Sequence, residues 1–294
     1  MYGPAVHWKP ALACSAGFFY KEEMALRMSK EQALDWGMAA LFIISIVLMQ
    51  LIAELSLAFG LWGFLALSLV AVPSRYKPAA AMILAIVTGY YAAGSISEAM
   101  KEYSRTVSPS AELAVALSRI GLVGYLVPLA LTVRLYPLRT NLLAVGTLPR
   151  LPIASRDVPQ PIWRALSIAL LANIALFCLL IDWRYLFVQP AVWFWSGLLF
   201  ASINSSLETV LWRGFALSRC IDAFGAIRGI LICGAAFGLY HYSFIQDWRI
   251  CILFGFGGIF FGWLAWKSGG LFAPWLLHFV MNILFVMSGM IFGY

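Results

Sequence analysis

The sequence predicts an all-α protein, a polytopic integral membrane bundle of eight or nine transmembrane helices. Hydrophobic residues make up 63% of the 294 residues and charged residues only 11%, whereas about 25% of the residues in a typical soluble domain are charged. So few charges cannot cover the surface of a water-soluble domain of this length. The mean hydropathy of +0.88 agrees, and helices satisfy every backbone polar group inside a bilayer.

Apolar runs long enough to cross a bilayer recur along the chain, and each predicts one helix. Only Glu54 separates the first two runs, and one residue cannot reverse a pair of helices. We therefore expect either a turn that takes up residues 54–60 or one re-entrant span. The predicted spans are residues 36–53, 55–72, 79–97, 113–133, 163–181, 190–210, 228–245, 250–266 and 271–291.

Charge and proline content divide the chain into four regions. Residues 1–35 mix basic and acidic side chains ahead of the first apolar run, which predicts an extramembrane arm. Residues 134–162 are rich in arginine and proline, which favours a cytoplasmic linker under the positive-inside rule. This linker separates N-terminal membrane helices (36–133) from a C-terminal core (163–294). The net charge of +7 therefore indicates topology in a lipid bilayer, and no basic run with interleaved aromatic residues supports nucleic-acid binding.

Polar side chains gather in the C-terminal apolar helices, where a central charge costs about 2.5–3.5 kcal/mol on insertion scales. Glu208 ends one predicted span, and His241 follows Phe237 by one helical turn on another. His278 and Asn282 are four residues apart and share one face of a third helix. Each alone is more often an interhelical hydrogen-bonding or packing residue. Together they would satisfy one another most cheaply in one polar pocket.

Other charged residues near these helices are predicted to have structural positions. Glu208 and Arg213 are five residues apart, about 140° around an ideal helix, so they are not a simple helical ion pair. We expect Arg213 to lie past the end of its helix. Glu54, Glu98 and Arg119 lie near the ends of predicted spans, where long side chains reach the membrane interface.

A pocket of this composition suits amide hydrolysis without a covalent intermediate. A partly desolvated Glu208 can take a proton from water, while imidazole and amide groups hold the water or stabilise an oxyanion. The alternative is a zinc site with Glu208, His241 and His278 as its three protein ligands. No HExxH motif is present and the five cysteines form no CxxC pair, so no metal or other cofactor is expected. A serine triad is disfavoured because no GxSxG motif occurs.

Three motifs, in this order, resemble the CPBP family of CAAX proteases and bacteriocin-processing enzymes, which are intramembrane endopeptidases. The family patterns EExxxR, FxxxH and HxxxN correspond to Glu208–Arg213, Phe237–His241 and His278–Asn282. One apolar span, 250–266, separates the second motif from the third, as in the family. The resemblance covers roughly residues 190–291 and implies that the C-terminal core is catalytic.

The resemblance also implies a role for each matching residue. Glu208 matches the glutamate that activates water in the family, and Arg213 matches the arginine that orients or supports it. His241 matches the histidine that helps to hold the water. His278 and Asn282 match the residues of the oxyanion site, and Phe237 supports His241.

The sequence departs from the family pattern at one position, and this departure leaves two possible functions open. Thr209 stands where the family has its second glutamate, and a hydroxyl cannot replace a carboxylate as a strong metal ligand or as an acid. The substitution favours a single-glutamate mechanism over zinc. We predict an endopeptidase that cleaves a membrane-associated protein or peptide in a bacterial inner membrane. The alternative is a non-catalytic membrane scaffold or regulator of a partner enzyme; a transporter is disfavoured because no internal repeat is evident.

Overall fold

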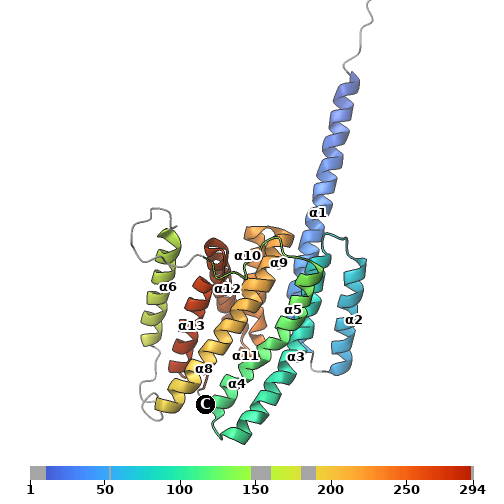
Figure 1. Cartoon of the computed structure of the whole chain (residues 1–294). Coiled ribbons are helices and arrows are strands. Elements are labelled where there is room, and N and C mark those ends of the chain that lie inside the picture. The colour runs from blue at the N-terminus through green and yellow to red at the C-terminus, as the bar shows by residue number, and fades with distance from the viewer. Residues whose placement is uncertain (1–10, 53, 147–159, 180–189, 293–294) are drawn as a thin grey trace, which may run out of the picture. The chain divides into compact units, whose positions relative to one another are not determined.

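The computed structural model is built of helices. Its described residues, 11–52, 54–146, 160–179 and 190–292, contain no strand, and Figure 1 shows the helices in chain order. The predicted all-α class is confirmed. Four helical segments are long and apolar enough to cross a membrane, and three shorter apolar helices accompany them: Lys30–Leu51, Lys77–Val107, Ala111–Leu135 and Trp248–Ser268, then Ser56–Ala71, Ile162–Cys178 and Phe272–Met287.

Most of the helices overlap the predicted spans, although the first begins well before its span, and several short helical segments lie between the longer helices. In chain order they are α1 (Ala11–Leu51), α2 (Leu55–Ala71), α3 (Lys77–Val107), α4 (Ala111–Ser118), the 3-10 turn η1 (Arg119–Leu122), α5 (Val123–Leu135), α6 (Gln160–Cys178), α8 (Pro190–Glu208), the π-helical segment η2 (Thr209–Ala216), α9 (Leu217–Phe224), α10 (Ala226–Tyr240), α11 (Tyr242–Ile245), α12 (Trp248–Ser268) and α13 (Phe272–Met287).

The chain forms two compact units, residues 1–41 and 42–294. The predicted arm, 1–35, falls in the first unit, and its first ten residues lie outside the described part. Residues 11–35 begin α1, which continues without a break to Leu51. That the arm is extramembrane stays a prediction.

The first turn of the second unit lies earlier than predicted. α1 ends at Leu51 and α2 begins at Leu55, so only a short stretch separates the two helices (Figure 1). Glu54 has an extended backbone, with φ −83° and ψ 130°. Its carbonyl accepts a hydrogen bond from Ala58 N at 3.0 Å. The prediction that residues 54–60 form the turn is therefore wrong, because the helix begins immediately after Glu54.

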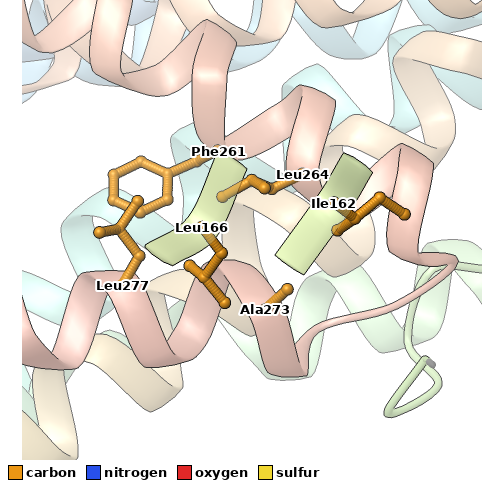
Figure 2. Packing of buried hydrophobic residues seen from close by; sticks show 6 residues of the cluster. All are labelled: Ile162, Leu166, Phe261, Leu264, Ala273 and Leu277. Atoms are coloured by element: carbon orange, nitrogen blue, oxygen red, sulfur yellow. The ribbon is translucent and has the colours of Figure 1, made fainter. Parts of the chain in front are cut away.

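The helix α6, which follows the predicted linker, packs against α12 and α13. Its residues Ile162 and Leu166 join a buried cluster with residues of both later helices, as Figure 2 shows. This packing fixes α13, which carries two predicted site residues. The cluster comprises Ile162, Leu166, Phe261, Leu264, Ala273 and Leu277.

Glycines bring α10 and α12 into backbone contact. A Cβ atom built on Gly258 would lie 2.8 Å from the carbonyl oxygen of Gly234. One built on Gly238 would collide with the backbone of Cys251 and Gly255. Small residues on α10 and α12 therefore permit this close helix approach, which fixes the position of α10 against α12.

Gly238→Ala should destabilise the protein, because neither backbone can move aside to admit the methyl group. We expect the free energy of unfolding to fall by about 1–3 kcal/mol, as in other overpacked cores. Gly257→Ala, on α12, is the matched control because nothing lies within 4 Å of its added Cβ. Unfolding of the two variants in detergent measures the difference, and equal stability would contradict the close contact.

Candidate functional site

The first motif lies where the helix changes its hydrogen-bonding pattern. α8 ends at Glu208, and the chain continues as the π-helical segment η2 and then as α9. In a π-helix the hydrogen bonds join residues five apart, so Arg213 comes about one turn beyond Glu208. Arg213 is 2% exposed and lies inside a continuous helical run. The prediction that it lies past the end of its helix is wrong, because the helical run continues through η2 into α9.

Aromatic rings enclose the guanidinium of Arg213. Its Cζ atom lies 4.0 Å from the ring centroid of Phe237 and 4.7 Å from that of Phe261, distances typical of cation–π contacts. Neither terminal nitrogen has a hydrogen-bond partner among the described residues. Phe237 therefore supports the first motif through Arg213, a contact that joins η2 to α10.

Glu208, Thr209 and His278 meet in the interior. His278 Nε2 lies 3.7 Å from Glu208 Oε2, and His278 Nδ1 lies 3.5 Å from the hydroxyl of Thr209. The first distance is too long for a direct hydrogen bond. A third atom about 2.8 Å from each would complete a triangle with them. Glu208 Oε2 is buried without a hydrogen-bond partner among the described residues, so it can accept a hydrogen bond from water.

The side chain of Asn282 places a hydrogen-bond donor on the face of α13 that also carries His278. It is buried on α13 one turn after His278, and its Nδ2 has no partner among the described residues. Buried donors without partners are rare in native structures. An amide in this position can donate a hydrogen bond to an oxyanion.

His241 lies close enough to Glu208 to interact with it electrostatically, but it makes no hydrogen bond to Glu208 among the described contacts. It follows the end of α10, its Nδ1 lies 2.7 Å from the carbonyl oxygen of Phe237, and its ring stacks on Phe254 at 4.5 Å. A carbonyl can only accept, so Nδ1 carries the hydrogen and Nε2 of the neutral ring is left as an acceptor. Glu208 interacts electrostatically with His241, as it does with His278.

Sequence reasoning missed Arg119, which reaches into the site from the N-terminal half. Its Nε donates to Asn204 Oδ1 at 2.7 Å, and its Nη2 donates to Glu208 Oε1 at 3.1 Å. The prediction that Arg119 extends to the membrane interface is therefore wrong. The cost of a charge inside an apolar span could have marked this residue, but no spacing in the sequence links it to Glu208.

A mostly apolar groove of about 240 Å³ opens beside Thr209. One wall is the segment after α5, which pairs with the start of α13: Leu271 N donates to Ala144 O at 2.9 Å, and Phe272 N donates to Val145 O at 3.0 Å. The groove is lined by Leu143, Ala144, Val145, Ser206, Thr209, Val210, Leu271, Phe272 and Trp275. The groove has room for a side chain of an extended peptide, next to the polar site.

The donors do not fit the three-ligand zinc site that the sequence left open. The described residues contain no group of three or more His, Cys, Asp or Glu side chains placed to hold a metal ion. Glu208 Oε2 and His278 Nε2 lie 3.7 Å apart, but the described residues place no third such side chain with them. We therefore derive no step through a metal.

Comparison with known proteins identifies the C-terminal part. Residues 187–284 match the model of the Rce1-like family, described as type II CAAX prenyl endopeptidase Rce1-like. No curated protein and no solved structure matches the chain. The matched residues, about a third of the chain, contain all three motifs. The apolar helices and the family match indicate an integral membrane protein. The match agrees with the resemblance seen in the three motifs, and it shows that residues 187–284 are similar to the Rce1-like CAAX protease family.

Proposed function

We propose that the protein is an intramembrane endopeptidase that hydrolyses a peptide bond of a membrane-associated protein or peptide with water activated by Glu208. The observation that carries this proposal is the buried pair of Glu208 Oε2 and His278 Nε2, 3.7 Å apart. A water held by both atoms would be oriented for attack. The match to a protease family supports the reaction class.

In the proposed reaction Glu208 takes a proton from the water as the water oxygen bonds to the carbonyl carbon. The carbonyl oxygen becomes an oxyanion, which a hydrogen bond from Asn282 Nδ2 would stabilise. The C–N bond then breaks, and the proton passes from Glu208 to the leaving amine. The hydroxyl of Thr209 near His278 Nδ1 would orient the imidazole, and His241 Nε2 would hold the water from the other side.

The surroundings of this reaction are part of the proposal. We propose eight or nine transmembrane spans in a bacterial inner membrane, with bilayer lipid and a protein or peptide substrate as partners. The name of the matching family refers to prenylated CAAX proteins, which makes a lipidated C-terminal tail one candidate substrate.

A second function has one observation in its favour. Thr209 replaces the second acidic residue of the family motif, as a non-catalytic membrane scaffold or regulator would allow. In that case the polar site would serve only to hold the helices together. The two functions differ in whether the chemistry of Glu208 matters once the protein is folded.

Glu208→Gln should abolish cleavage, because an amide keeps the shape of the side chain but cannot take up a proton. We expect a loss of at least about 10²–10⁴-fold, the usual contribution of a general base, and a similar loss for His241→Ala. Termini in the membrane and secreted proteomes of a host expressing each variant at matched levels measure the effect. Glu102→Gln is the control, since this residue is exposed on α3. Unchanged termini alongside a clear deletion phenotype would favour the scaffold.

Chelation should leave cleavage unchanged, because the proposed mechanism needs only water and protein groups. The purified protein is treated with a strong chelator, and the cleavage rate is measured before and after dialysis. A loss of activity that added zinc restores would overturn this part of the mechanism.

Val145→Trp should weaken substrate binding, because the larger side chain would fill the groove beside Thr209. We expect KM to rise severalfold with little change in kcat, the signature of lost uniform binding. Val127→Trp, an exposed position on α5, is the control. An unchanged KM in a folded Val145→Trp variant would remove the groove from the substrate path.

A further inference from the structure

The shortest side-chain contact of Glu208 among the described residues comes from outside the part of the chain that matches the family. Arg119 lies at the junction of α4 and the 3-10 turn η1, inside the candidate span Ala111–Leu135. A 3-10 stretch within a longer helix often marks a functional position. Here it directs an arginine from the N-terminal half toward a glutamate of the C-terminal core.

The guanidinium of Arg119 binds two residues of one helix face together. Asn204 and Glu208 are four residues apart on α8, so their side chains are neighbours. The fork of Arg119 spans them, with Nε on Asn204 Oδ1 at 2.7 Å and Nη2 on Glu208 Oε1 at 3.1 Å. The Glu208 side chain is 1% exposed and that of Arg119 is 16% exposed, so this pair is shielded from screening by water.

Aromatic rings limit where the guanidinium can lie. Its Cζ atom is 5.6 Å from the ring centroid of Phe200 and 5.0 Å from that of Phe244. Phe200 lies on α8 one turn before Asn204, and Phe244 lies on α11. Arg119 is therefore held by cation–π contacts as well as by its two hydrogen bonds.

These contacts distinguish the two oxygens of the carboxylate. Oε1 accepts a hydrogen bond from Arg119, whereas Oε2 is the oxygen that lies toward His278. A free carboxylate would rotate and exchange its oxygens. A hydrogen bond from a planar arginine fork that is also anchored on Asn204 disfavours this exchange.

We infer that Arg119 is a positioning residue of the hydrolytic site, which holds Glu208 by Oε1 and so keeps Oε2 directed at the water beside His278. This inference rests on the proposed function. It makes the N-terminal half part of the site, because neither Arg119 nor its helix lies within the matched residues 187–284. Arg119 acts through Glu208 and does not touch the substrate.

Kinetics of Arg119→Ala in the full-length protein test the inference. We expect kcat to fall about 10²-fold, the effect of a small misplacement of a reacting group, with KM nearly unchanged. Because the side chain is partly exposed, added guanidinium should restore part of kcat. Arg119→Lys should recover less than the native arginine, since an ammonium cannot span both acceptors.

Arg219→Ala is the matched control. Arg219 is also a buried arginine of the same unit, but it donates to Tyr136 O and pairs with Asp222 at 3.9 Å. We expect this variant to lower stability while leaving kcat of the folded fraction unchanged. Thermal unfolding of each variant identifies the folded fraction.

Two results would overturn the inference. One is a folded Arg119→Ala variant with unchanged kcat while Glu208→Gln is inactive, which leaves the proposed function intact. The other is a loss of kcat that guanidinium does not relieve, which assigns Arg119 a structural role. If Arg119→Ala does not fold, Arg119→Lys and Asn204→Ala replace it, and unchanged kcat in both overturns the inference. Activity in Glu208→Gln would instead remove the proposed function itself.

Discussion

The burial of one carboxylate is the constraint on which the rest of the site depends. An ionised side chain taken out of water is costly unless charges and hydrogen bonds compensate it. Glu208 is almost fully buried, and the helices around it supply this compensation. Arg119 donates a hydrogen bond to Oε1, Arg213 interacts with the carboxylate electrostatically, and His278 Nε2 lies 3.7 Å from Oε2. The charge therefore explains why helices that are distant in sequence must meet here.

This constraint also joins the two halves of the chain. Arg119 connects the α4–η1 junction to α8, and the segment that follows α5 connects to α9. There Thr140 N donates to Asp222 Oδ1 at 2.8 Å, and Leu142 N donates to Ser218 Oγ at 3.1 Å. The helical run from α8 through η2 to α9 is thus held on both sides of the motif, which gives the π-helical segment fixed ends.

Sequence patterns predicted the helices better than the contacts between them. An apolar run in a bilayer is a strong local signal, so the predicted span 250–266 differs little from α12 (Trp248–Ser268). The continuation of α1 through residues 11–35 was not predicted, because the charged residues at 21–35 interrupt the apolar pattern on which the span prediction rested. The π-helical position of Arg213 and the contact of Arg119 with Glu208 depend on packing between residues that are distant in the sequence. Hydrophobic periodicity carries no information about such contacts. The predicted spans did place Glu208 at the end of α8 and His278 and Asn282 on α13, as the structure has them.

Thr209 is best understood from the contact that it makes. Its hydroxyl faces His278 Nδ1 at 3.5 Å, where a hydroxyl can either donate or accept. Such a contact orients the imidazole without adding a second negative charge beside Glu208. A second carboxylate at this position would repel the first in a buried site and would need a further cation to balance it. A threonine here is therefore compatible with a site that works with one glutamate held by Arg119.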